Sequence, residues 1–392
     1  MTDRTENPPH PSYGPHRVLF LHGLFRKRFD YGGRTILKII ARQIPNAAVS
    51  SMPDLLLQDG ARCSRYLITP GIGNGSLNPI ELVDVVYDDI IQDFDRRRSL
   101  FCKVLSSIWT CVTQCCRLVR FICGVRSKIP NHQTLRILLN ASIYPAYAIV
   151  NFLLLVSIVL GCWEYVWPTV GSGENSKLPL GLAALAIIFA LKNLFVNARW
   201  IERFENDSSS AFAFVECQKP ESELRRTLSA RVYAAIIESD ESAQPREISI
   251  LAYSQGALLA IDALFPANGS ASPPCKEEKI RVNNLVTFGC PLPIAKRFWP
   301  NRRRNQPEHQ AIVHNWINFY EKDDTLGGPL FEAIREEGID VGVQDKEFTY
   351  SPPEGTSVWQ LPHQSYWHEA MTTRCEGFRR VVTALATTKR TR

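Results

Sequence analysis

The sequence has few features of a secreted or nucleic-acid-binding protein. Met1–His16 is polar and proline-rich, and no basic start leads into a short apolar stretch, so we expect no cleaved secretory signal there. Lys and Arg residues leave a formal net charge of +6, but they are not gathered into a recognition helix or a zinc-finger spacing. We therefore expect no nucleic-acid partner.

The cysteines lack the spacing of a metal site or a disulfide framework. The chain has 11 of them, but at 392 residues it is too large to need disulfide staples. Five crowd one segment without paired metal-ligand spacing. They are Cys102, Cys111, Cys115, Cys116 and Cys123. We expect a reducing compartment and no metal or organic cofactor.

Two uncharged stretches predict a membrane hairpin. Ile137–Trp163 has 27 consecutive residues without a charged side chain, and crossing a bilayer core takes about 20 apolar residues. Leu178–Leu191 adds 14 more and continues past Lys192 to about residue 198, which spans only if Lys192 snorkels to the interface. Turn residues fill 164–177 between them. The alternative is a buried helical pair inside a large soluble domain.

Basic residues on the outer flanks of the hairpin predict its orientation. Those before it are Arg117, Arg120, Arg126, Lys128 and Arg136, and those after it are Lys192, Arg199 and Arg203. By the positive-inside rule, both flanks of this integral membrane protein face the cytoplasm. Leu100–Val125 resembles an interfacial helix with cysteines available for acylation, and a solvated or core helix is the alternative.

The remaining parts alternate short apolar runs with helical patterns. Strands are expected at 17–21, 80–86, 247–252, 284–288 and 316–320, and helices at 33–44, 222–238 and 255–264. This alternation predicts an α/β fold, with a mostly parallel sheet covered by helices on both faces.

A strand, a small-x-Ser-x-Gly turn and a helix follow one another around Ser254. A nucleophilic serine sits on such a strained turn, where small residues two before and two after it relieve crowding between strand and helix. Ala252 and Gly256 fill those positions. We expect Ser254 to be the nucleophile and the Gln255 backbone N–H to donate to an oxyanion. An ordinary helix-capping serine is the alternative.

A second oxyanion donor is expected after an earlier strand. Val18–Phe25 has the right form, because His22-Gly23 ends an apolar strand and the N–H of Leu24 is then expected to point at the substrate oxygen. A plain strand turn is the alternative.

The acid and the base are expected in the order nucleophile, acid, base. Asp324 follows the strand at 316–320 and is favoured as the carboxylate that orients the imidazole, with Asp323 as the alternative. His363 lies in a late loop and is favoured as general base over His368, which we expect on the last helix.

Several stretches together resemble a group of lipase-like α/β hydrolases. The motifs of that group are a histidine-glycine strand end, an A-H-S-Q-G elbow, T-F-G-S-P-L, W-x-N-x-x-x-x-x-D-P and H-x-x-Y-W. Their counterparts are His22-Gly23, Ala252–Gly256, Thr287–Leu292, Trp316–Asp324 and His363–Trp367. The chain departs from the pattern at Tyr253 (usually His), Cys290 (Ser) and Thr325 (Pro), and none of these removes a reacting group.

The resemblance covers 17 to about 95 and 210 to 385, and it implies a serine hydrolase with an α/β-hydrolase fold. The helical membrane hairpin is expected from the uncharged stretches, as an insert that interrupts this fold. The expected parts are a disordered tail (1–16), a hydrolase domain in two pieces (17–99 and 206–386), a membrane-associated insert (100–205, with spans at about 137–163 and 178–198) and a C-terminal tail (387–392). We expect a lipid or acylated ester substrate held near the bilayer. The alternatives are an inactive hydrolase-fold scaffold that tethers partners at a membrane, and an acyltransferase.

Overall fold

The computed structural model describes two compact units. The described residues are 15–23, 31–44, 46–71, 78–97, 216–217, 222–238, 248–266, 281–298, 312–321, 324, 327–348, 366 and 382. The first unit consists of 1–88, 226–296 and 300–392, and the second consists of 89–225 and 297–299.

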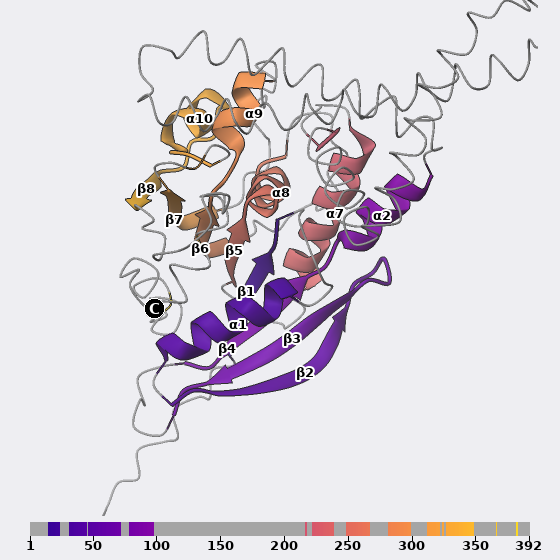
Figure 1. Cartoon of the computed structure of the whole chain (residues 1–392), viewed down its shortest axis with the longest axis vertical. Coiled ribbons are helices and arrows are strands. Elements are labelled where there is room, and N and C mark those ends of the chain that lie inside the picture. Colours follow the sequence, from indigo (N-terminus) through magenta and orange to yellow (C-terminus); the bar gives the residue numbers. More distant parts are fainter. Residues whose placement is uncertain are drawn as a thin grey trace, which may run out of the picture. The chain divides into compact units, whose positions relative to one another are not determined.

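An eight-stranded sheet forms the centre of the first unit, in the order β2-β3-β4-β1-β5-β6-β7-β8 (Figure 1). The strands are β1 (His16–Leu21), β2 (Ala48–Leu56), β3 (Arg62–Thr69), β4 (Ile80–Val85), β5 (Ile248–Tyr253), β6 (Arg281–Phe288), β7 (Ile312–Glu321) and β8 (Val343–Phe348). The β3 strand runs antiparallel to both neighbours, and every other pairing is parallel. The predicted α/β class is confirmed, with a mixed sheet.

Along the chain, helices connect most of the consecutive strands. They are α1 (Tyr31–Gln43), α2 (Asp88–Arg96), α7 (Glu223–Glu238), α8 (Gln255–Leu264), α9 (Leu292–Phe298) and α10 (Phe331–Glu336). The α1 helix is amphipathic, with Ile36 and Ile40 buried and Lys38 and Arg42 exposed. All ten residues of α8 are buried, which suits a helix that is apolar on nearly every side.

The core covers both faces of the sheet. One cluster joins α1 to alternate strand residues such as Val18, Leu82 and Phe319, and it also contains Tyr366 and Val382 from the C-terminal segment. On the opposite face, Phe265 at the end of α8 stacks on Trp316 of β7 with ring centroids 6.0 Å apart. Helices therefore cover both faces.

The two strands at the β2 edge were not predicted from the sequence. Pro53 interrupts β2, the pairing with β3 shifts register between Met52 and Leu55, and most β2 side chains are exposed. Proline and irregular pairing are typical of an edge strand. Such a strand has little of the buried apolar run that identified β1 and β5.

None of the described helices is long and apolar enough to span a membrane. The expected spans at 137–163 and 178–198 lie outside the described residues.

Candidate active site

Ser254 occupies the sharp turn between β5 and α8. Its backbone has φ 54° and ψ −124°, a left-handed region that costs a non-glycine residue about 1–3 kcal/mol. The N–H of Ser254 donates to the carbonyl oxygen of Phe288 at 2.9 Å, which ties the turn to the end of β6. The Ser254 side chain makes no capping hydrogen bond to α8. Helix capping therefore does not explain this serine.

Two glycines allow the strand ends and the helix to approach the Ser254 turn. An ideal Cβ on Gly256 would lie 2.5 Å from the carbonyl oxygens of Leu21 and His22, a separation that real Cβ atoms do not show. An ideal Cβ on Gly23 would lie 3.0 Å from the Ser254 Cβ. The expected small residue after the serine thus has a physical cause, since α8 begins in contact with the end of β1.

His22 holds the end of β1 in place. Its ring stacks on Tyr87 with centroids 4.4 Å apart, and its Nδ1 lies 2.6 Å from the Gly23 carbonyl oxygen. The Tyr87 hydroxyl donates to the His22 carbonyl oxygen, and Asp88 Oδ1 lies 3.8 Å from His22 Nε2. His22 is therefore a buried group that fixes the backbone next to Ser254.

The chain leaves β1 and β5 in opposite directions, although the two strands are neighbours. After β1 it continues to β2, β3 and β4 on one side, and after β5 it continues to β6, β7 and β8 on the other. Ligands in open α/β sheets bind beyond the carboxyl ends of the strands at such a switch point. Gly23 and Ser254 follow those two ends.

Asp324 lies three residues beyond the end of β7. Its N–H donates to the Glu321 carbonyl oxygen at 3.1 Å, and the residue is 9% exposed. An ideal Cβ on Gly327 would lie 2.5 Å from Asp324 Oδ2 and 2.6 Å from the Gly289 Cα. The carboxylate is therefore packed closely against the loop ends that follow β6 and β7.

Tyr366 is the partner of Asp324 that the sequence did not identify. Its hydroxyl donates to Asp324 Oδ2 at 2.7 Å and accepts the Glu321 N–H at 3.0 Å. Burial, and then the negative charge of Asp324, raise the pKa of Tyr366 well above its usual value. The H-x-x-Y-W stretch, which places Tyr366 three residues after His363, was the available signal.

Tyr253 lies between the serine turn and the tyrosine that binds the acid. Its ring centroid is 6.0 Å from that of Tyr366, and its ring atoms are 3.4 Å from an ideal Cβ on Gly23. Burial, followed by the charge of Asp324, raises the pKa of Tyr253. Ser254 and Asp324 are thus linked through the two tyrosines.

The T-F-G and W-x-N motifs form a buried polar group beneath the loop that follows Asp324. The Thr287 hydroxyl donates to Asn318 Oδ1 at 2.9 Å and accepts from Trp316 Nε1 at 3.2 Å. Asn318 Nδ2 donates to the Gly328 carbonyl oxygen at 3.0 Å and to Asp345 Oδ1 at 2.7 Å. These side chains position the loop.

Of the expected site residues, the structure brings His22, Gly23, Ser254 and Gly256 together, and Gln255 begins α8 beside them. Asp324 is joined to this group through Tyr366 and Tyr253. Leu24, Asp323 and His363 lie outside the described residues. Among the described residues, no group of three or more His, Cys, Asp or Glu side chains could hold a metal ion.

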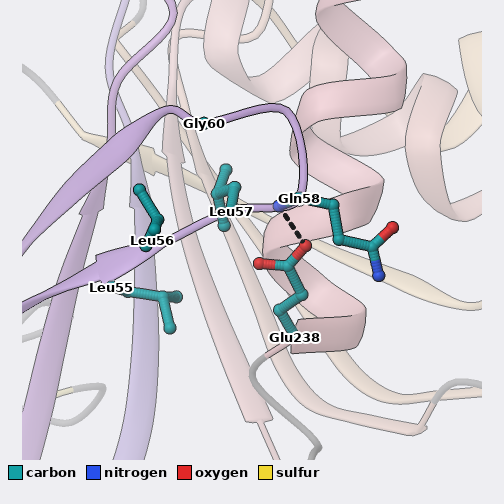
Figure 2. A pocket seen from close by; sticks show the side chains of 6 residues that line it. All are labelled: Leu55, Leu56, Leu57, Gln58, Gly60 and Glu238. Atoms are coloured by element: carbon teal, nitrogen blue, oxygen red, sulfur yellow. Dashed lines mark hydrogen bonds between the residues drawn. The ribbon is translucent and has the colours of Figure 1, made fainter.

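The pocket in Figure 2 is far from these residues in the sheet order. It has a volume of about 370 Å³ and lies at the turn between β2 and β3, lined by Leu55, Leu56, Leu57, Gln58, Gly60 and Glu238. Glu238 Oε1 accepts the Gln58 N–H at 2.7 Å, so the only charged lining residue among those described is engaged in fixing the turn. We assign the pocket no part in catalysis.

The chain matches no family model, and comparison with curated proteins and with solved structures gives no match.

Proposed function

We propose that this chain is a serine hydrolase that cleaves carboxylic esters through an acyl-enzyme, with Ser254 as the nucleophile. One observation carries the proposal: Ser254 adopts φ 54° at a strand-to-helix turn, next to Gly23, at the switch point of the sheet. A strained backbone of this kind persists where the surrounding structure holds it, and such residues cluster at active sites. In an α/β hydrolase, a turn of this kind presents the nucleophile hydroxyl beyond the carboxyl ends of the central strands.

The proposed base is His363. A serine hydroxyl is a weak nucleophile and needs an adjacent base. Three residues of chain span at most about 11 Å, so His363 lies within that reach of Tyr366, which contacts Asp324 at 2.7 Å. We assign proton transfer to His363 and its orientation to Asp324, with Asp323 as the other carboxylate in the same loop.

The proposed oxyanion donors are the backbone N–H groups of Gln255 and Leu24. Helix geometry directs first-turn N–H groups out of the N-terminal end, and Gln255 is the first residue of α8. Leu24 directly follows Gly23, on which an ideal Cβ would lie 3.0 Å from the Ser254 Cβ. Donors from both sides of the serine stabilise the negative charge that develops on the substrate carbonyl oxygen.

We further propose an α/β-hydrolase fold for the first unit and a membrane anchor at 137–163 and 178–198. The mixed sheet, with the nucleophile following a central parallel strand, supports the first. The uncharged stretches support the second, with the catalytic unit on the cytoplasmic side. An anchored site favours a lipid or acylated substrate because the anchor raises the local concentration of that substrate.

Alkaline carbonate extraction tests the proposed anchor. The full chain should stay with the membrane pellet, and its release into the supernatant would contradict the anchor.

An ester hydrolysis assay tests the proposed function. Purified full-length protein in detergent is given p-nitrophenyl esters with short to long acyl chains. We expect hydrolysis by the wild type, and losses of about 1,000-fold or more in kcat for Ser254→Ala and His363→Ala. Ser51→Ala is the matched control because Ser51 is exposed on the edge strand β2.

The outcomes separate the alternatives. Equal hydrolysis by the wild type and Ser254→Ala overturns the proposal. No hydrolysis of any ester by a folded wild type favours an inactive scaffold. Ester products formed from an added alcohol, at the expense of free acid, identify an acyltransferase that uses the same residues.

A further inference from the structure

Tyr366 makes two hydrogen bonds to the loop that carries the proposed acid. Its oxygen accepts the backbone N–H of Glu321, the last residue of β7, at 3.0 Å. Its hydroxyl proton goes to Asp324 Oδ2 at 2.7 Å. The tyrosine is 3% exposed, so neither bond competes freely with water. A neutral donor thus lies directly against the carboxylate.

The two contacts fix the direction of the hydroxyl. A phenol has a single proton, and the Glu321 N–H already occupies one side of the oxygen. The proton is therefore directed at Asp324. Because burial raises the pKa of Tyr366 well above its usual value, the hydroxyl stays protonated through the neutral range. Tyr366 is a permanent donor to this carboxylate.

The same oxygen of Asp324 is confined by the backbone. Oδ2 lies so close to Gly327 that an ideal Cβ on that residue would be 2.5 Å away, and the Gly289 Cα borders the same space. The carboxylate cannot rotate freely there without losing the Tyr366 hydroxyl.

We propose that Tyr366 is a positioning residue, whose hydroxyl orients the Asp324 carboxylate at the end of β7. This inference rests on the proposed function. To the proposed Ser254, His363 and Asp324, it adds a residue that orients the Asp324 carboxylate. Tyr366 acts through Asp324. One hydrogen bond sets the acid, and the other ties the Tyr366 hydroxyl to the end of β7.

The role has an electrostatic consequence. Among the described residues, the titratable groups that act on Tyr366 are Asp324 and Tyr253, and the Glu321 backbone N–H donates to its hydroxyl oxygen. A donor to Asp324 takes up part of its negative charge. Without the hydroxyl, the carboxylate attracts the imidazolium more strongly, so the base holds its proton to higher pH. The reaction should then need a higher pH while its maximal rate falls.

Labelling kinetics with a fluorophosphonate probe test the proposal. The rate constant of each time course is measured from pH 5 to pH 9 on full-length protein in detergent. This rate constant does not depend on the fraction of molecules that fold, whereas the final extent of labelling does. For Tyr366→Phe we expect a maximal rate about 10-fold lower and an apparent pKa raised by roughly half a unit to one unit. Tyr320→Phe is the matched control, because it removes a tyrosine hydroxyl on β7 that donates to Glu347 at 3.0 Å and not to Asp324. It should follow the wild type.

A double-mutant cycle decides whether Tyr366 acts through Asp324. In the Asp324→Asn background, Tyr366→Phe should change the rate by about twofold or less. The proposal is overturned if Tyr366→Phe follows the wild-type profile, or if it slows labelling equally in both backgrounds with no shift in the apparent pKa. Labelling of Ser254→Ala as fast as wild type defeats the proposed function itself and this role with it. A silent Ser254→Ala beside an unaffected Tyr366→Phe defeats only this role.

Discussion

An ideal Cβ on Gly256 lies 2.5 Å from the carbonyl oxygen of Leu21, so the first turn of α8 rests directly on the end of β1. Both atoms in conflict belong to, or are attached to, the backbone, which cannot turn away as a flexible side chain can. The contact sets how closely Ser254 approaches Gly23. It accounts for a glycine at this position independently of any motif.

Gly256→Ala should therefore destabilise the fold. Inserting a methyl into such a packed contact costs about 1–3 kcal/mol, and the shift needed to relieve it moves the Ser254 turn. The measurement is the urea midpoint of unfolding, compared with Gly342→Ala. Gly342 has nothing within 4 Å of its ideal Cβ, so this control should unfold near the wild type. Equal midpoints for Gly256→Ala and the wild type would show that the contact is not tight.

Asn318→Ala should weaken the loop that follows Asp324. Asn318 is fully buried, and its amide nitrogen donates to Gly328 and to Asp345. Removing the Asn318 amide takes away the acceptor of the Thr287 hydroxyl and the donor to the Gly328 carbonyl oxygen. Leaving such buried groups unsatisfied costs about 1–3 kcal/mol in stability. We expect a lower thermal midpoint and slower fluorophosphonate labelling. Asn315→Ala on the same strand removes bonds to Asn284 and Gln344 farther from the carboxyl end, and it should leave labelling unchanged. Identical labelling rates for both variants would contradict the assigned role.

The thiol of Cys63 should be inert in the folded protein. Cys63 is fully buried on β3, and burial raises its pKa to about 11, with a smaller opposing effect of a hydrogen bond from the Val86 backbone. The thiolate is the reactive form, so alkylation at pH 8 should spare Cys63 unless urea is present. Peptide mass spectrometry reads this position separately from the other cysteines. Rapid alkylation without urea would show that β3 is not buried as described.

The same pKa has a consequence for stability at alkaline pH. In the unfolded chain the thiol has its usual pKa of 9.0, while burial raises the pKa to about 11 in the folded chain. The folded state therefore loses stability as pH rises from about 9 to 11, and the full contribution is present below that range. Cys63→Ala should lose less stability than the wild type over this interval, measured as urea midpoints. Parallel losses in both proteins would contradict the shift.

The sequence predicted the central strands and the serine turn because their signals are local. The buried run of β5, the turn at Ser254 and the apolar helix α8 are contiguous, and each is readable without its neighbours. The edge strands β2 and β8 escaped prediction, because Pro53 and the charged, mostly exposed residues of Val343–Phe348 do not form an apolar run. The β8 strand forms through its pairing with β7, and such a tertiary contact leaves no local signal in the sequence.

The candidate site was predictable only in part for the same reason. His22 and Gly23 were identified as a strand end, but the stacking of His22 on Tyr87 depends on a residue 65 positions away. The Tyr366 bond to Asp324 joins residues 42 positions apart. Spacing along the chain gives the order of such groups, while their pairing depends on the sheet that brings strand ends together.

Identification of the residue that carries the fluorophosphonate adduct tests the central claim most directly. The wild type is labelled in detergent at neutral pH, digested, and the modified peptide is sequenced by mass spectrometry. We expect one adduct, on Ser254, that is lost in Ser254→Ala and greatly reduced in His363→Ala. An adduct on another serine, or an equal adduct in Ser254→Ala, would contradict the account.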